Sequence, residues 1–440
     1  MVTQTSRNRE LVERAHAAIG GSLGALFVPD DLSVVVDHAS GAHLYDVDGR
    51  RYIDYLLGSG PMLLGHAHPE IVAAVQERVA MGLSYFTMSD IIIEFAERLI
   101  EIVPCAEQIR FVSTGTEATY HALRIARAYT DRPKVLKFEG GYHGVHDYAL
   151  MSAHAQKQTD YPTPIPDSKG IPRSVESNVV VSCWNDVELT EEIVRAHKHE
   201  LAAIICEPLQ RALVAAPGFL KELRRIADEN DVLLIFDEVV TGFRLALGGA
   251  QEKYGVIPDI AALGKAMSAG YPMAAVAGRK DILNVTIPGK YADGVVRMGG
   301  TMSGNPVGAA AGLTSMDILS REGVYERLYD TADRLKNALR AQAAERDLSI
   351  QVLGEGPVFQ MLFTTQPISN YPDFLAADRE KSRQFGLECI RRGVTTTPGE
   401  KFYVSLAHSD EDVEETIAVF ADAFDALLER DAGRGTRDAI

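Results

Sequence analysis

An acidic and a basic side chain each follow a short apolar run of this chain. Residues 232–236, VLLIF, lead directly into Asp237, and residues 260–263, IAAL, lead through Gly264 into Lys265. In an open parallel sheet, ligands bind outside the carboxyl ends of the strands. If both runs are strands of one such sheet, a carboxylate and an amine meet in the same crevice.

These two groups suit a particular cofactor. A lysine amine forms a Schiff base with an aldehyde, and a carboxylate holds a protonated ring nitrogen. Pyridoxal 5′-phosphate (PLP) carries both the aldehyde and the ring nitrogen. Asp237 and Lys265 therefore predict a PLP-dependent protein.

A candidate phosphate site lies earlier in the chain, at residues 113–117, STGTE. This segment follows a predicted strand, 109–112, and opens a predicted helix, 118–129. A glycine between hydroxyl side chains at a helix N-terminus offers free N–H groups and the positive end of the helix dipole. The alternative is an ordinary helix cap. No GxGxxG or Walker sequence occurs, so a nucleotide is not the natural ligand.

Two further segments follow apolar runs. After residues 135–138 comes GGYHG, in which Tyr142 could lay its ring on a planar cofactor; the alternative is a turn with a packed aromatic ring. After residues 201–206 comes Glu207, a third carboxylate at the expected edge. His143, with His146 and Asp147 nearby, could suggest a metal, but no ligand-spacing motif accompanies them and we expect none.

The elements that must position these side chains alternate in type from about residue 70. Runs that are apolar throughout suit strands covered on both faces, as in parallel α/β sheets. Asp48-Gly49 between residues 42–46 and 51–55 predicts a hairpin. Residues 152–177, rich in Pro, Ser, Lys and Asp, are interpreted as a long loop over the site and a candidate lid. The predicted strands include 109–112, 135–138, 201–206, 232–236 and 274–277.

The whole chain has 440 residues, more than one ordinary core, so two subdomains are expected. We predict an N-terminal arm and part of a small domain over 1–70, a large cofactor-binding domain over 71–315 and a C-terminal small domain over 316–440. The net charge of −17 argues against a nucleic-acid partner. Neither a signal peptide nor a membrane-spanning run is visible, and the four scattered cysteines form no CxxC, so we expect a cytoplasmic protein.

Taken together, these features resemble class III PLP-dependent aminotransferases of fold type I, and most of all the branch containing glutamate-1-semialdehyde 2,1-aminomutase. The resemblance runs from about residue 35 to 408. It implies an α/β fold: a large domain with a mostly parallel seven-stranded sheet, plus a small α+β domain formed by the N- and C-terminal segments. It also implies a homodimer with shared active sites. The segments that carry it are DVDGRRYIDY, GHAHPEI, FVSTGTEATYHALRIARAYT, KFEGGYHG, FDEVVTGFR, GKAMSAGYPMAAVAGR, GTMSGNP and SLAHSDEDV.

The resemblance also implies residue roles. Lys265 would be the Schiff-base lysine and proton shuttle, and Asp237 would pair with the pyridinium nitrogen. Tyr142 and Val239 would pack on opposite faces of the ring, and Thr301 would reach the phosphate of the partner subunit's cofactor. The full set implied to bind the cofactor is Thr114, Gly115, Thr116, Tyr142, His143, Glu207, Asp237, Val239, Lys265 and Thr301.

Departures from the aminomutase pattern concern the substrate. Gly24 stands where the aminomutase has a carboxylate-binding arginine, which removes a charge-assisted clamp. Ser59, Phe86 and Val276 replace a tryptophan, a small residue and a tyrosine, so a more apolar, reshaped pocket is expected. Glu400 keeps one polar anchor. The expected substrate pocket comprises Ser59, Tyr85, Phe86 and Glu400.

The leading hypothesis is an aminotransferase that moves an amino group between an amine or amino acid and a keto acid or ketone. The amino compound would have an apolar or aromatic side, and β-amino acids are included. The alternative is an aminomutase of the glutamate-1-semialdehyde type, a racemase or a lyase on the same scaffold. The motifs do not separate these two, because both use Lys265 and Asp237. A non-catalytic PLP-binding regulator or structural dimer is disfavoured by the complete set of Asp237, Lys265 and Thr301.

Overall fold

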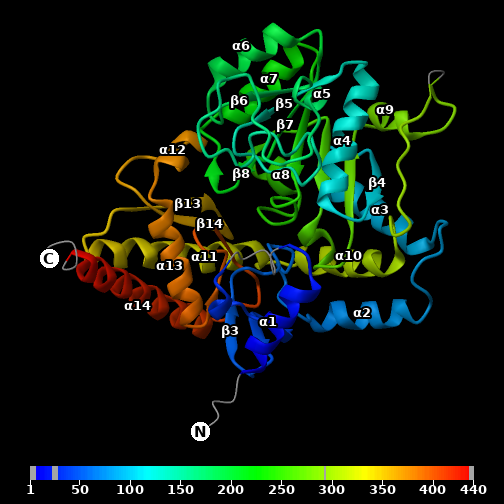
Figure 1. Cartoon of the computed structure of the whole chain (residues 1–440). Coiled ribbons are helices and arrows are strands. Elements are labelled where there is room, and N and C mark those ends of the chain that lie inside the picture. The colour runs from blue at the N-terminus through cyan, green and yellow to red at the C-terminus, as the bar shows by residue number, and fades with distance from the viewer. Residues whose placement is uncertain (1–5, 22–27, 292–293, 436–440) are drawn as a thin grey trace. The chain divides into compact units, whose positions relative to one another are not determined.

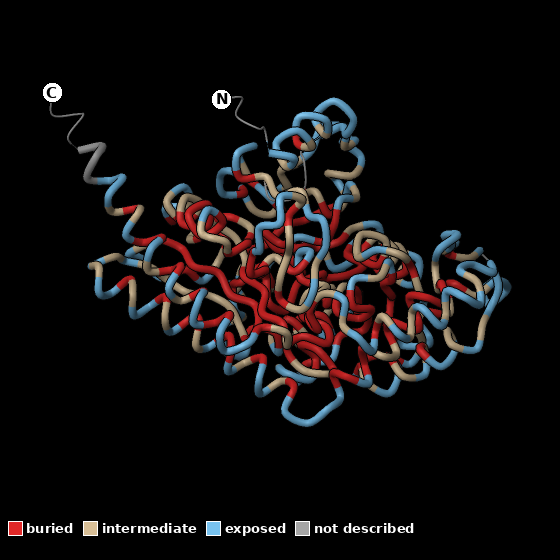
Figure 2. The backbone as a smooth tube through the Cα atoms, turned by 90° about the horizontal axis from the view of Figure 1, so that it is seen from below, coloured by how far each residue is buried: buried red, intermediate tan, exposed pale blue. Residues whose placement is uncertain are grey.

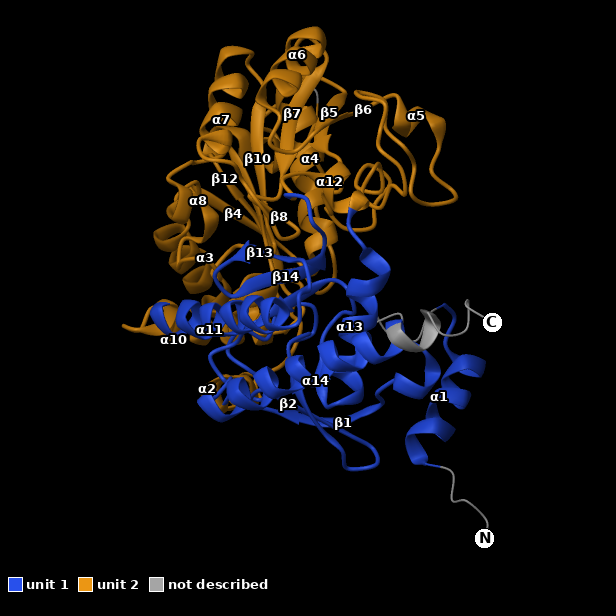
Figure 3. Ribbon diagram, turned by 90° about the vertical axis from the view of Figure 1, so that its left-hand side faces the viewer, with its two compact units in different colours: residues 1–68, 326–367, 377–440 blue, residues 69–325, 368–376 orange. Residues whose placement is uncertain are grey.

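The structure is a computed structural model, in which residues 6–21, 28–291 and 294–435 are described. The chain runs through alternating helices and strands (Figure 1). It divides into two compact units (Figure 3). Unit 1 comprises residues 1–68, 326–367 and 377–440, and unit 2 comprises residues 69–325 and 368–376.

Unit 2 is built on a seven-stranded sheet with the order β4-β12-β11-β10-β7-β5-β6. Every strand runs in the same direction except β12, which is antiparallel to both of its neighbours. The sheet is therefore mostly parallel, and the predicted fold class is confirmed. The strands are β4 (Gln108–Val112), β5 (Lys134–Phe138), β6 (Val179–Ser182), β7 (Leu201–Cys206), β10 (Leu233–Glu238), β11 (Ile260–Leu263) and β12 (Ala274–Gly278).

Helices cover this sheet and bury its strands. Helix α4 packs across β12, β11 and β7, while α6 contacts β6 and α7 contacts β10. All residues of β7, β10, β11 and β12 are buried, as expected for apolar strands with both faces covered (Figure 2). The helices of unit 2 are α2 (Pro69–Val79), α3 (Asp90–Ile102), α4 (Gly115–Thr130), α5 (Arg173–Glu176), α6 (Val187–His197), α7 (Phe219–Glu229), α8 (Gly249–Tyr254), α9 (Lys280–Leu283), α10 (Pro306–Leu319) and α12 (Tyr371–Ala376).

Short elements complete unit 2. The 3₁₀ turn η2 (Lys265–Ser268) directly follows β11, and a second one, η3 (Asn284–Thr286), follows α9. A small hairpin is made by β8 (Leu209–Gln210) and β9 (Leu213–Val214). Strand β6 was not predicted, although its Val-Val-Val-Ser sequence carries the β-branched signal of a buried strand.

Unit 1 contains two smaller sheets. The predicted hairpin is confirmed: β2 (His43–Asp46) and β3 (Arg51–Asp54) pair antiparallel. β1 (Val36–Ser40) pairs with β2, and β15 (Val394–Thr395) adds to β3 in parallel. A three-stranded sheet is formed by β13 (Ile350–Glu355), β14 (Val358–Phe363) and β16 (Lys401–Tyr403). The helical elements are α1 (Arg7–Ala18), η1 (Asp30–Leu32), α11 (Val324–Glu345), α13 (Arg379–Arg391) and α14 (Asp410–Gly435).

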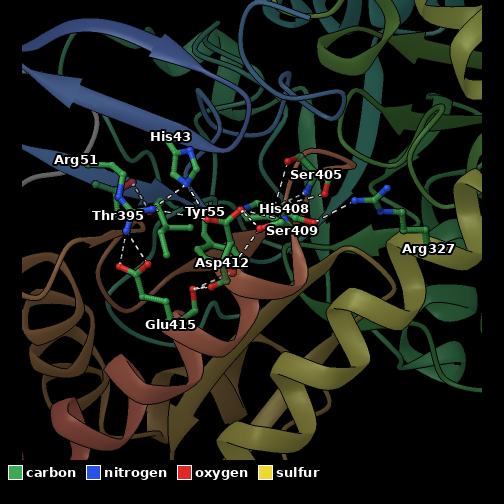
Figure 4. Close-up of polar contacts among 12 residues, drawn as sticks. His43, Arg51, Tyr55, Arg327, Thr395, Ser405, His408, Ser409, Asp412 and Glu415 are labelled. Atoms are coloured by element: carbon green, nitrogen blue, oxygen red, sulfur yellow. Dashed lines mark hydrogen bonds and ion pairs between the residues drawn. The ribbon is translucent and has the colours of Figure 1, made fainter.

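A polar network ties the first turns of α14 to the N-terminal strands of unit 1 (Figure 4). The buried Asp412 carboxylate lies 2.7 Å from His43 Nε2 and accepts a hydrogen bond from the Ser409 hydroxyl at 2.8 Å. Glu415 lies one turn further along α14, and Arg51 donates to both of its carboxylate oxygens. These contacts connect β2 and β3 with α14 within unit 1, although the segments are far apart in the sequence.

The contact-based units and the expected domain boundaries fall at different places. Helix α10 spans the expected boundary at residue 315 and belongs wholly to unit 2, as do residues 368–376. Among the described residues, none of the helices combines the length and the apolar character needed to cross a membrane.

Candidate active site

Three of the expected site residues of unit 2 lie at the carboxyl ends of the parallel strands. Asp237 lies in β10, Glu207 follows β7, and Lys265 follows β11 by one residue. Asp237 pairs in register with Ala262 of β11, and Phe236 pairs with Cys206. Because these strands are parallel neighbours, their carboxyl ends lie side by side, at the edge where open parallel sheets bind ligands.

The adjacent carboxylates of β10 do different work. Successive side chains of a strand point to opposite faces of the sheet. Asp237 Oδ2 lies 2.8 Å from His143 Nδ1, whereas Glu238 accepts hydrogen bonds from the Thr241 hydroxyl and the Ala250 amide at 2.9 and 2.6 Å. Asp237 therefore contacts His143, and Glu238 holds the start of α8 in place.

His143 is buried against Asp237. Burial, reinforced by the positive charge of Lys137, lowers the pKa of His143 to about 3, although Glu207 acts in the opposite sense. The imidazole is therefore neutral at physiological pH, and its Nδ1–H donates to the Asp237 carboxylate. Thr119 of α4 donates a hydrogen bond from its hydroxyl to the backbone carbonyl of His143 at 2.6 Å. This contact holds the His143 backbone against α4.

Tyr142 lies on the segment between β5 and the 152–177 loop, and the residue is 41% exposed. Its backbone N–H donates to Glu207 Oε2 at 2.9 Å. The ring meets that of His154 edge-on, with 5.9 Å between the ring centroids. Tyr142 and Glu207, which the sequence indicates as separate candidates, are thus in direct contact, and Tyr142 is partly exposed next to the buried His143.

The segment predicted to bind an anion lies at the start of α4, as expected for a helix N-terminus. Thr114 caps the helix by accepting a hydrogen bond from the Glu117 amide, and the Glu117 side chain accepts from the Thr114 amide in return. This is the capping box, so the ordinary-cap alternative correctly describes Thr114. The first-turn amides of Gly115 and Thr116 remain available as donors, because a helix leaves its first N–H groups without intrahelical partners.

Val239 lies between this turn and the lysine. A Cβ placed on Gly115 would approach Val239 Cγ1 to 2.9 Å, and one placed on Gly264 would approach it to 3.5 Å. The Val239 amide donates to Asp237 Oδ1 at 3.1 Å. One valine therefore touches the anion turn, the residue before Lys265 and the buried acid.

Lys265 stands at the first position of η2 with φ of 49°. A left-handed conformation is unfavourable for a residue with a Cβ and is found most often where function requires it. The strained position directs the chain sharply after β11.

These residues fit a pyridoxal phosphate group. The α4 turn offers amide and hydroxyl donors suited to a phosphate. Asp237 offers an anion that is held in place by His143, and Lys265 offers an amine. Apolar and aromatic groups, Val239 and Tyr142, lie beside them.

Thr301, Tyr85 and Phe86 form a second group within unit 2. All three line an open cavity of about 350 Å³. The Ser84 hydroxyl donates to the Thr301 carbonyl at 3.3 Å, which links the two segments. Phe86 is 86% exposed and adopts φ of 53°. The described residues that line this cavity do not include Thr114, Gly115 or Thr116 of the α4 turn.

The remaining expected pocket residues lie elsewhere. Ser59 is exposed, with φ of 68°, and Glu400 lies in the turn before β16; both belong to unit 1. Gly24 lies outside the described residues. We expected Val276 to lie in the substrate pocket, and this expectation is wrong. Val276 is 0% exposed and lies within the sheet, where it pairs with Arg110 of β4 and Ala262 of β11.

Two buried charged residues next to the site were missed by the sequence reasoning. Lys137, in the middle of β5, donates to three backbone carbonyls. Glu139 accepts hydrogen bonds from the Thr159 amide and the Tyr161 hydroxyl and so anchors the 152–177 loop. A lysine inside an otherwise apolar run was the available signal. The described residues include no group of three or more His, Cys, Asp or Glu side chains placed to hold a metal ion.

Comparison with known proteins agrees with this geometry. The family model of class-III aminotransferases matches residues 28–424. The chain is 40% identical over 419 residues to a glutamate-1-semialdehyde 2,1-aminomutase of Roseiflexus castenholzii, covering 94% of this chain and 93% of that one. It is 41% identical over 424 residues to the protein of the same name from Methanopyrus kandleri, covering 95% and 97%.

Solved structures of transaminases are also similar. An omega-transaminase from Sphaerobacter thermophilus superposes with a TM-score of 0.90 at 32% identity, covering 97% of this chain and 98% of that one. A β-phenylalanine aminotransferase from Variovorax paradoxus superposes with a TM-score of 0.82 at 26% identity, covering 94% and 92%.

Proposed function

Because the chain belongs to the class-III aminotransferases, enzymes that use pyridoxal 5′-phosphate, we propose that it is an aminotransferase whose catalytic residues are Lys265 and Asp237. The observation that carries this proposal is the buried Asp237–His143 pair at the same sheet edge as Lys265. When bound, the cofactor supplies an electron sink and a carrier for the amino group.

The proposed roles follow from the contacts. Asp237, oriented by His143, holds a proton at the ring nitrogen. The amides of Gly115 and Thr116 and the hydroxyl groups of Thr114 and Thr116 would bind the phosphate. Lys265 holds the cofactor before the substrate arrives and then moves a proton between the substrate carbon and the cofactor.

Three further residues complete the proposed cofactor site. Tyr142 and Val239 cover opposite faces of the ring. Glu207 orients the Tyr142 segment through its bond to the Tyr142 amide.

A homodimer with shared active sites is part of the proposal. Exposed apolar side chains gather along residues 79–93, beside the cavity that Thr301 lines. Such a concentration of exposed apolar side chains is typical of a protein interface. Thr301 would then contribute to the site of the other subunit. The exposed apolar residues of this surface are Val79, Met81, Leu83, Tyr85, Phe86, Met88, Ile93 and Met302.

We propose an amine or amino acid with an apolar or aromatic side as the amino donor, with β-amino acids included, and a keto acid or ketone as acceptor. Phe86 and Tyr85 support this, because aromatic side chains line the cavity beside Thr301. The similarity to an omega-transaminase and to a β-phenylalanine aminotransferase also supports it. Ser59 and Glu400 complete the proposed pocket.

The second candidate is a glutamate-1-semialdehyde-type aminomutase. The two curated relatives at 40% and 41% identity carry that name, which favours this candidate. Racemase or lyase chemistry is part of the same alternative, because it would use Lys265 and Asp237 as well. A cytoplasmic location is proposed in either case, and the buried free thiols of all four cysteines support a reducing environment.

The test is to add candidate donor amines one at a time to the purified holoenzyme, without any keto acid, and to record its visible spectrum. A transaminase loses the visible absorption band permanently with each true donor, because the amino group stays on the cofactor. The same experiment includes glutamate 1-semialdehyde. If that compound alone is converted, with full recovery of the band and no reaction of apolar amines, the aminomutase candidate replaces the leading one.

A further inference from the structure

Lys137 is a fully buried lysine that the proposed reaction does not use. Its residue is 1% exposed. Nζ donates to the carbonyl oxygens of Gly141, Ala149 and Met151 at 3.0, 2.8 and 2.5 Å. Three acceptors match the three N–H groups of an ammonium ion, whereas a neutral amine has only two. The geometry therefore describes a buried cation.

The three carbonyls bracket the segment that carries Tyr142 and His143. Gly141 immediately precedes these two residues, and Ala149 and Met151 lie at the far end of the segment. Lys137 thus draws both ends of the segment onto β5. A side chain that bonds both ends at once restricts the position of the residues between them.

The start of the segment is held independently. The Gln210 amide donates to the Glu139 carbonyl at 2.7 Å, and Arg211 Nε donates to the Gly140 carbonyl at 2.7 Å. The part after Gly141 is held by Lys137 together with the contacts of Glu207 to the Tyr142 amide and of Thr119 to the His143 carbonyl. Removing the Lys137 contacts would therefore loosen this part more than the part before it.

The charged groups around Lys137 act in both directions. Burial lowers the pKa of Lys137 to about 7; Asp167 and Glu207 counteract this, and Arg211 adds to it. The positive charge of Lys137 in turn lowers the pKa of His143, after burial, and also that of His146. The charged and titratable groups that interact electrostatically with Lys137 are Asp167, Glu207, Arg211, His143 and His146.

We propose that Lys137 is a positioning residue that holds Tyr142 against one face of the cofactor and His143 against Asp237. Its charge also adds to the effect of burial in favouring the neutral His143 imidazole, whose Nδ1–H donates to the Asp237 carboxylate. This inference rests on the proposed function, because it places Asp237 at the ring nitrogen.

The test compares Lys137→Met with Lys134→Met. Both lysines lie in β5, but Lys134 makes only a peripheral ion pair with Glu200 at 2.9 Å. We expect Lys137→Met to raise the dissociation constant for PLP about tenfold or more. We expect the pKa of His143 to rise by about one unit as the neighbouring charge is removed. The His143 measurement uses ¹⁵N chemical shifts of the imidazole, assigned with a His143→Asn variant. Lys134→Met should change neither quantity.

A folded Lys137→Met protein with wild-type PLP affinity and an unshifted His143 would overturn the inference. If Lys137→Met does not fold, Lys137→Gln keeps a donor without the charge, and it should raise the pKa of His143. The wild-type holoenzyme gives an independent reading, since a charged His143 imidazole at pH 6 would also overturn the inference. Failure of the proposed function has a separate signature: wild-type protein that binds no PLP at Lys265.

Discussion

At the scale of single residues, the neighbouring acids Asp237 and Glu238 show how a strand separates a reaction from a structural task. The pleat turns them to opposite faces, one toward His143 and the other toward the start of α8. Burial raises the pKa of Glu238, while hydrogen bonds from Ala250 and Thr241 counteract it. The two carboxylates should therefore respond differently to the same loss of charge.

We predict that Asp237→Asn lowers kcat by about 10²–10³-fold, because a charge aimed at the reacting ring is lost. Its thermal stability should stay close to that of the wild type. The matched control, Glu238→Gln, should keep kcat and lose about 1–2 kcal/mol of unfolding free energy, because the bonds to the start of α8 weaken. Steady-state kinetics and chemical denaturation check both variants. Equal losses of kcat would contradict the separation of roles.

Much of this site could be predicted from residue order. The apolar runs that end in Asp237 and in Gly264-Lys265 pointed to one sheet edge, and the register of β10 and β11 places them there. The contact between His143 and Asp237 could not be predicted, because it joins residues 94 positions apart. Val276 was misjudged as a pocket residue, because the type of an apolar residue does not show whether it packs within the core or lines a pocket; all residues of β12 are buried.

At the scale of elements, Val239, the residue after β10, lies so close to the start of α4 that a side chain at Gly115 would collide with it. A Cβ there would lie 2.9 Å from Val239 Cγ1 and 3.1 Å from its Cγ2. Either the helix start or the valine would have to move, and both line the proposed phosphate and ring sites.

We predict that Gly115→Ala raises the dissociation constant for PLP about tenfold, which corresponds to about 1.4 kcal/mol. The double variant Gly115→Ala with Val239→Ala lacks the methyl groups that obstruct the new Cβ. It should therefore recover most of the PLP-binding free energy that the phosphate contacts contribute. Gly20→Ala is the control, because a Cβ at Gly20 meets nothing within 4 Å. Titration of apoenzyme with PLP measures all of them. A double variant that binds more weakly than both single variants combined would refute the steric explanation.

In unit 1, the element that carries a testable interaction is α14. Burial raises the pKa of Asp412, but hydrogen bonds from Ser409 and the contact with His43 outweigh it, and the net shift is downward from 3.8. A lowered carboxyl pKa stabilises the folded state above the unfolded-state pKa, and that stabilisation is lost as the pH falls through the folded-state pKa.

We predict that Asp412→Asn lowers the unfolding free energy by about 1–3 kcal/mol at pH 7. The difference from the wild type should shrink as the pH falls below about 4, since the wild-type carboxyl becomes protonated there. Asp422→Asn, an exposed carboxylate of the same helix, is the control and should have little effect at either pH. A deficit of Asp412→Asn that is independent of pH would contradict the electrostatic account.

At the scale of the whole molecule, the parallel sheet could be predicted because its strands are nearly continuous apolar runs. The set of segments that makes up each unit could not be predicted, because each unit includes segments from distant parts of the chain. Residues 368–376 belong to unit 2, where the Tyr371 hydroxyl donates to the Ala155 carbonyl 216 residues away. The Tyr371 ring fills the space beside Gly140, where a Cβ would come within 2.1 Å of it. No local pattern in the sequence announces such a contact.

The proposed dimer belongs to this scale as well. We predict that Phe86→Glu, which places a charge on the exposed apolar surface, weakens association by at least about tenfold. Ile257→Glu is the control, because Ile257 is an exposed apolar residue of the same unit but lies outside that surface. Light scattering coupled to size exclusion gives the mass of each variant. Dimers of unchanged stability in Phe86→Glu would place the subunit interface elsewhere.

The most direct test of the central claim is to locate the lysine that holds PLP. Reduction of the holoenzyme with borohydride makes the Schiff-base linkage permanent, and peptide mapping by mass spectrometry then identifies the modified residue. We predict a single phosphopyridoxyl group on Lys265, and none on that peptide after Lys265→Ala. A label on Lys137 or on any other lysine, or no label at all after saturation with PLP, would contradict the assignment of the active site.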